Sequence, residues 1–140
     1  MATDHTRNTY GQLMLGFSQS FDQDHEARWA WLMAAHIVGQ QDFGLHWRSH
    51  VAMLRFALQA RDYREATGQM LRLSLVPLGH LASRLPAGNT GRATVSAFRP
   101  MPVTPYLRQL MTLASEKAMQ VGVTSCPVEK GQEGADFRRR

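Results

Sequence analysis

Along most of the chain, apolar side chains recur with the spacing of amphipathic helices. Asp24 precedes one apolar segment and is expected to be the N-cap of a helix that ends at Gly39. Asp42 is expected to cap the next helix, which runs to about Ala60. Before them, a stripe with apolar residues at i, i+3, i+4, i+7 and i+11 predicts a first helix, and its members are Tyr10, Leu13, Met14, Phe17 and Phe21.

A fourth apolar segment follows Asp62, and Glu65, three residues later, indicates a capping box at its start. Pro77 has no amide hydrogen and is expected to kink or end this helix. Residues 78–85 would then form a separate apolar piece.

The segment 86–104 breaks the helical pattern, because glycine, asparagine and proline recur within it. These residues favour turns and extended backbone, which predicts an extended arm. Thr104 and Pro105 then provide the N-cap and first position of a fifth helix, which is expected to end at Gly122. Apolar residues are few from 123 to 140, where we expect a disordered basic tail.

The four helices before the arm form two similar pairs. Segments 25–27 and 63–66 each follow an acidic residue and open the second helix of a pair. We therefore predict an all-α fold of two antiparallel helical hairpins, either a degenerate tetratricopeptide-like (TPR-like) pair or a compact bundle. The extended Pro/Gly arm and a C-terminal helix complete a single domain over residues 1–122.

Composition narrows the class of protein. No apolar run approaches the roughly 20 residues that span a bilayer, and the N-terminus is polar, so we expect no membrane association. The single cysteine, Cys126, cannot form an intrachain disulfide, which favours the cytoplasm. Three of the five net positive charges come from Arg138–Arg140. We interpret this run as a solvated tail, so nucleic acid is not the expected partner.

Three histidines surround the turn between the second and third predicted helices. His46 and His50 lie one turn apart on the apolar face that also carries Met53 and Ala57. His36 lies on the apolar face of the preceding helix, close to its end. Because a short turn joins the two helices, the sequence predicts that the three imidazoles converge.

Neutral imidazole is a ligand for zinc, copper or nickel, and three histidines with an open fourth position form a recognised kind of metal site. Asp22, Asp42 and Glu65 are candidates to complete the site or to orient its ligands. No glutamate lies between His46 and His50, so the zinc-protease helix motif is absent. The alternative is structural: the histidines bond to backbone groups, to Gln40 or Gln69, or to one another.

The arm contains a second candidate site, because its glycine-rich turn can present backbone N–H groups and a guanidinium to an anion. It lacks the lysine and the spacing of a Walker loop. The alternative is a rigid arm whose Phe98 and Met101 dock across the helices. The residues of this possible anion site are Gly88, Asn89, Thr90, Gly91 and Arg92.

Four segments resemble a bacterial family of proteins of unknown function, DUF3703: AHIVGQ (35–40), HWRSHVAMLR (46–55), REATGQMLR (64–72) and PAGNTGRATVSAFRPMP (86–102). The family pattern has glycine and asparagine where this chain has Arg92 and Thr94, which weakens the case for an anion-binding loop. The family has no assigned activity. Its members tend to lie near heavy-metal resistance genes, so the resemblance implies a role in metal stress.

The sequence therefore favours an accessory cytoplasmic protein that binds a transition metal through His36, His46 and His50. The alternative is a TPR-like interaction module with structural histidines, which binds a protein partner or a second copy of itself. No serine or cysteine lies in a recognisable nucleophile motif, so no catalytic residue is predicted.

Overall fold

The computed structural model describes residues 2–82 and 85–124, and all regular structure within them is helical. The elements are α1 (Asp4–Gln19), α2 (His25–Gly39), α3 (Phe43–Gln59), α4 (Tyr63–Leu81) and α5 (Pro105–Thr124). The predicted all-α class is therefore confirmed. The tail expected from 125 onward, including Cys126 and Arg138–Arg140, lies outside the described residues.

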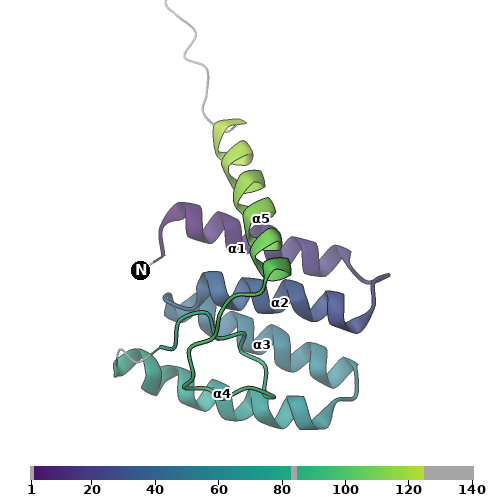
Figure 1. Ribbon diagram of the computed structural model, residues 1–140, viewed down its shortest axis with the longest axis vertical. Helices are drawn as coiled ribbons and strands as arrows, with labels where there is room; N and C mark the ends of the chain where they lie inside the picture. The colour runs from purple at the N-terminus through teal and green to yellow at the C-terminus, as the bar shows by residue number, and fades with distance from the viewer. Residues whose placement is uncertain (1, 83–84, 125–140) are drawn as a thin grey trace, which may run out of the picture.

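The first four helices, α1 to α4, lie side by side in the order of the chain (Figure 1). The pairs α1–α2 and α3–α4 pack as the two predicted hairpins, and α2 packs against α3 to join them. The last helix, α5, stands across this layer and contacts α1 and α2. Helix α2 therefore contacts α1, α3 and α5 and joins the two hairpins.

Three aspartates begin three of the helices as the sequence predicts. Asp24 accepts a hydrogen bond from the Ala27 amide at 2.7 Å, and Asp62 accepts one from the Glu65 amide at 3.0 Å. Asp42 accepts from the Leu45 amide at 3.1 Å and also from the amide of Ala2. Each bond satisfies an amide that has no partner inside the helix.

The structure corrects the boundaries at both ends of the four-helix layer. Phe21 was expected in the first stripe, but it follows the end of α1 and is 79% exposed. Pro77 does not end α4, which continues to Leu81 and so takes in residues 78–81 of the expected separate piece. Pro77 faces solvent, where water can satisfy the carbonyl that loses its helical partner. At the other end of the fold, α5 continues past the predicted stop at Gly122.

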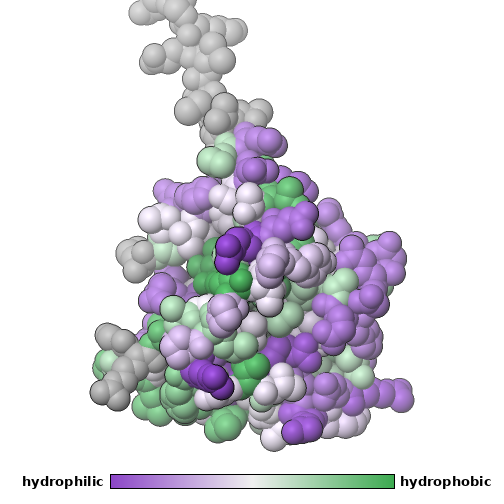
Figure 2. All heavy atoms as spheres, in the orientation of Figure 1, coloured by the Kyte–Doolittle hydropathy of each residue, from purple (hydrophilic) through white to green (hydrophobic). Residues whose placement is uncertain are grey.

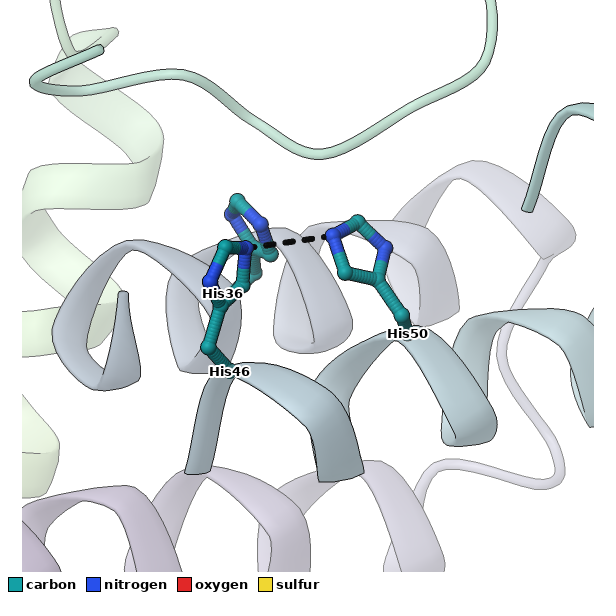
Figure 3. Close-up of side chains that lie close together, drawn as sticks. All are labelled: His36, His46 and His50. Atoms are coloured by element: carbon teal, nitrogen blue, oxygen red, sulfur yellow. Dashed lines mark hydrogen bonds between the residues drawn. The ribbon is translucent and has the colours of Figure 1, made fainter. Parts of the chain in front are cut away.

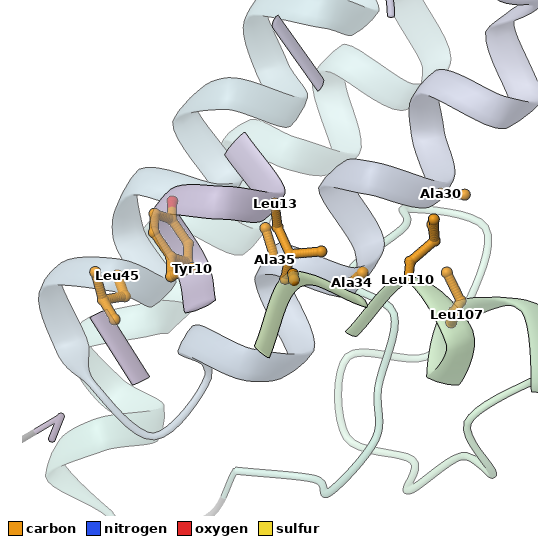
Figure 4. Packing of buried hydrophobic residues seen from close by; sticks show 9 residues of the cluster. Tyr10, Leu13, Ala30, Ala34, Ala35, Leu45, Leu107 and Leu110 are labelled. Carbon is orange, nitrogen blue, oxygen red and sulfur yellow. The ribbon is translucent and has the colours of Figure 1, made fainter. Parts of the chain in front are cut away.

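The buried apolar residues form two clusters that share α2. One cluster joins α2 to α1, to the start of α3 and to α5 (Figure 4), and consists of Tyr10, Leu13, Ala30, Ala34, Ala35, Leu45, Leu107, Leu110 and Ala114. The other joins α2 to α3 and α4, and consists of Trp29, Leu32, Met53, Phe56, Ala57 and Ala66. The alanines of α2 let its neighbours approach closely, because small side chains shorten the distance between helix axes.

Residues 85–104 form the predicted arm, without helix or strand. The buried side-chain amide of Asn89 donates hydrogen bonds through Nδ2 to the backbone carbonyls of Ser96 and Arg99. These bonds fold the arm back on itself. Gly88 has φ +70°, and a Cβ there would collide with the Met101 carbonyl, so only glycine fits. Phe98 is 71% exposed, so it is not buried against the helices as expected.

The exposed surface mixes polar and apolar residues (Figure 2). Apolar side chains gather at the lower left of this view, around the C-terminal half of α4, where Leu78 and Leu81 are exposed. Among the described residues, no helix is both long and apolar enough to cross a membrane.

Candidate metal centre

The three imidazoles meet in the interior where α2, α3 and the arm come together (Figure 3). His36 comes from the last turn of α2, while His46 and His50 lie one turn apart on α3. All three are buried, and their ring centroids are 4.7 to 5.0 Å apart. One nitrogen from each ring lies within 4.8 Å of the other two. The convergence predicted from the sequence is therefore confirmed.

The tautomer of His36 follows from its partner. Its Nδ1 lies 3.0 Å from the carbonyl oxygen of Asn89, which can only accept, so Nδ1 carries the proton. Burial lowers the pKa of His36 well below 6.5, with a further contribution from the neighbouring histidines. The ring is therefore neutral, and Nε2 carries a lone pair. This Nε2 is buried and has no hydrogen-bond partner among the described residues.

A chain of side chains from α4 determines the tautomer of His50. Gln69 uses its amide nitrogen to donate to Glu65 Oε1 at 2.8 Å and to the Gly91 carbonyl at 2.9 Å. Its oxygen is therefore the atom that faces His50 Nδ1, 2.7 Å away, and Nδ1 must donate. Burial lowers the pKa of His50 to about 4, so its Nε2 also carries a lone pair.

His46 lies between two imidazole partners. Its Nε2 is 3.2 Å from His50 Nε2, and its Nδ1 is 3.0 Å from His80 Nε2. Because His50 Nε2 is an acceptor, His46 Nε2 donates to it and Nδ1 accepts from His80. In the other neutral tautomer, Nδ1 of His46 donates to His80, and Nε2 of each of the three rings is unprotonated. Burial and nearby His50 lower the pKa of His46 to about 3, so both forms are neutral at pH 7.

The buried carboxylate of Glu65 holds Gln69, and through it His50, in place. Its Oε1 accepts from Gln69 and from the Ala93 amide at 2.8 Å, and its Oε2 lies 3.3 Å from Arg92 Nε. The Arg92 guanidinium also lies over the Trp29 ring, 4.1 Å from its centroid. The predicted capping box is therefore only half formed, because the carboxylate of Glu65 points into the protein instead of back to the helix start.

The other two candidate carboxylates lie outside the cluster. Asp42 caps α3, and Asp22 is exposed in the turn before α2. Among the described residues, the group with metal-binding spacing consists of the three histidines alone. Glu65 is linked to His50 through Gln69, and it has no hydrogen bond of its own to the histidines among the described residues.

The arm's glycine-rich turn covers the histidines. The Asn89 carbonyl holds His36, and the Gly91 carbonyl holds Gln69. Gly91 has φ +79°, and a Cβ there would lie 2.8 Å from Cδ2 of His36. The Gly91 amide donates to the Asn89 side chain, and Arg92 pairs with Glu65. Thr90, the remaining residue of the predicted anion site, is half-buried. Anion binding by residues 88–92 stays a prediction that these contacts do not test.

Two contributors to the site were missed at the level of sequence. One is His80, which meets His46; the other is Arg72, which is buried beside the cluster. Both lie on the same face of α4 as Glu65 and Gln69. Gln69 follows Glu65 by four residues, Arg72 follows Gln69 by three, and His80 lies about two turns further on. A stripe of polar residues on an otherwise buried helix face was the available signal.

A small cavity opens beside the imidazoles. The three histidines form part of its lining, and Arg72, Leu75 and Phe98 contribute to the rest. Its volume is about 40 Å³. A buried water needs roughly 10–15 Å³ by the same kind of measure, so the cavity accommodates a water molecule or a small ligand beside a metal.

Fold and site together define a small all-α protein with a buried cluster of three neutral histidines. The family model described as "Protein of unknown function (DUF3703)" matches residues 4–111. The chain therefore belongs to this family, which confirms the resemblance seen in the sequence. The matched range contains the three histidines, the arm and the supporting face of α4. No curated protein and no solved structure matches the chain.

The metal-free protein is expected to lose stability as the pH falls from about 6.5 towards about 4. Unfolded histidines take up protons near pH 6.5, whereas the pKa of His50 is about 4 and that of His46 about 3 in the folded protein. The unfolded state binds more protons in this window, so the free energy of unfolding decreases with falling pH. Urea midpoints measured between about pH 7.5 and 4.5 test this, and a constant midpoint would contradict it.

Replacing Gly91 with alanine is expected to destabilise the protein by about 1–3 kcal/mol, because a side chain is strained at this positive φ and collides with His36. Gly11→Ala is the matched control. Gly11 lies in α1, and a Cβ added there meets no neighbouring heavy atom within 4 Å, so alanine should stabilise the helix by about 0.5–1 kcal/mol. Urea unfolding measures both changes. Equal stability of Gly91→Ala and the natural protein would show that the turn tolerates the change.

Proposed function

We propose that this is a cytoplasmic accessory protein that binds one transition-metal ion through Nε2 of His36, His46 and His50, in metal stress or metal homeostasis. The observation that carries the proposal is the buried Nε2 of His36, which has no hydrogen-bond partner in the described part of the chain and belongs to a ring that packs against two further imidazoles. A buried acceptor without a partner costs free energy, and a metal ion would compensate for that cost.

The spacing of the nitrogens supports a metal after a small adjustment. Zinc–nitrogen bonds of about 2.1 Å place tetrahedral ligand atoms about 3.4 Å apart. The Nε2 atoms of His46 and His50 are already 3.2 Å apart, and one nitrogen from each of the three rings lies within 4.8 Å of the other two. Only His36 would need to shift inward, and its hydrogen bond to Asn89 sets the direction in which its lone pair points.

The donor set favours a particular group of metals. Three neutral imidazoles without a thiolate or carboxylate suit zinc, copper or nickel better than magnesium or calcium, which prefer oxygen. Each ligand also has a partner at Nδ1, namely a backbone carbonyl, a glutamine or a histidine. Such partners orient metal-bound histidines and raise their basicity.

The surroundings of the site support an accessory role over catalysis. Glu65 is the buried carboxylate nearest to the histidines through its bond to Gln69, and it is engaged by Gln69, Ala93 and Arg92. It is therefore not free to act as a general base at a metal-bound water.

A protein partner is a second candidate, favoured by the outward face of α4. Within the described part of the chain, α3 is the one helix against which α4 packs extensively. Large apolar side chains remain exposed along α4. They are Tyr63, Met70, Leu71, Leu78 and Leu81. An interaction module of this kind predicts that chelators leave partner binding unchanged, whereas metal delivery to a partner predicts that they change it.

The direct test is elemental analysis of untagged protein purified without chelator and re-equilibrated with zinc, copper or nickel. We expect close to one metal ion per chain, falling at least tenfold in the double variant His46→Ala, His50→Ala. The matched control is His5→Ala, His25→Ala, which removes two exposed imidazoles and should leave the metal content unchanged. Equal metal content in the natural protein and the His46, His50 variant would overturn the proposal, as would its absence from both.

A further inference from the structure

The cavity beside the histidines places a buried cation next to the position that a metal would leave open. Its lining includes all three imidazoles and the side chain of Arg72. Three histidines supply only three of the four ligands of a tetrahedral ion. Because the imidazoles border the cavity, the remaining coordination position would open into it.

The charges around this position do not balance once a metal is bound. The three imidazoles are neutral, and the Glu65 carboxylate is paired with Arg92. Arg72 is 8% exposed and has no acidic side chain among its hydrogen-bond partners in the described part of the chain. The Glu65 carboxylate also acts electrostatically on Arg72, so this one negative charge faces both guanidiniums. A divalent ion would therefore leave a net excess of three positive charges in a poorly solvated interior. Such an arrangement is costly unless an anion accompanies the metal.

Arg72 is positioned to hold that anion. Its Nη2 donates to the carbonyls of Arg92 and Val95 in the arm, the former at 2.6 Å, which fixes the guanidinium. Both bonds leave from this one nitrogen, so Nε and Nη1 have no hydrogen bond within 2–82 and 85–124. The positive charge of Arg72 also contributes to the lowered pKa of all three histidines, which places it within electrostatic reach of the cluster.

We propose that the metal-loaded protein takes a small monovalent anion as the fourth metal ligand, bound between the metal and the Arg72 guanidinium in this cavity. The inference rests on the proposed metal site and specifies what completes it. The volume of about 40 Å³ corresponds to roughly three water molecules, which suits hydroxide, a halide, formate or azide. Leu75, Val76 and Phe98 line the other walls, so larger or multiply charged anions fit the cavity poorly.

Cobalt(II) is a suitable probe, because its visible spectrum reports the coordination of a zinc-type site. In chloride-free buffer, one equivalent of cobalt should produce the intense bands of a four-coordinate ion. Azide should then change these bands saturably. In the cobalt-loaded Arg72→Met variant we expect the azide dissociation constant to rise at least tenfold. Arg55→Met, on the exposed face of α3, is the matched control and should bind azide like the natural protein.

Arg72→Lys covers the case in which Arg72→Met does not fold, since lysine keeps the charge and one donor while losing the planar fork. It should bind azide more weakly than the natural protein. If no cobalt binds to the natural protein, the proposed metal site and the anion inference both fail. If cobalt binds but azide leaves its spectrum unchanged, only the anion inference is overturned. Unaltered azide affinity in a folded Arg72 variant would contradict the role of the guanidinium.

Discussion

An imidazole buried without water needs a partner for each ring nitrogen, and three adjacent imidazoles multiply this requirement. In this protein the partners of the three Nδ1 atoms come from three different places: the Asn89 carbonyl, Gln69 and His80. The arm and α4 must therefore dock on α2 and α3 for the rings to be accommodated. What remains is the set of three Nε2 atoms, of which one has no partner among the described residues. Because this network engages Nδ1 of each ring, Nε2 is the nitrogen that remains for a further ligand.

The arm and the histidines form a single unit, although they are far apart in the sequence. Gly91 lies against the His36 ring, and its carbonyl fixes the amide of Gln69. Asn89 serves twice, because its carbonyl holds His36 and its side chain holds the arm's own fold. The arm offers free backbone carbonyls to the side chains of His36 and Gln69. A helix in its place could not do so, because carbonyls within a helix are already engaged along the helix. An irregular segment is thus the means by which the site is closed.

Local patterns were sufficient to predict the helices, their aspartate caps and the convergence of three histidines around one short turn. They were insufficient wherever a residue's role depends on a distant partner. Glu65 has the spacing of a capping box, yet Gln69 and Arg92 draw its carboxylate inward. Pro77 lies on the solvent side of α4, where its missing amide costs little, and periodicity alone did not reveal this. His80 was overlooked because its partner, His46, lies on another helix.

In the proposed metal-bound protein, His36, His46 and His50 present Nε2 to one ion while each Nδ1 keeps a proton. Nitrogen-15 NMR of histidine-labelled protein, recorded before and after one equivalent of zinc, observes these nitrogens one by one. We expect zinc to shift three Nε2 resonances together, all three Nδ1 atoms to be protonated in the zinc form, and His46 to change tautomer on binding. Unchanged spectra, or coordination through Nδ1 of His36 or His50, would contradict this arrangement.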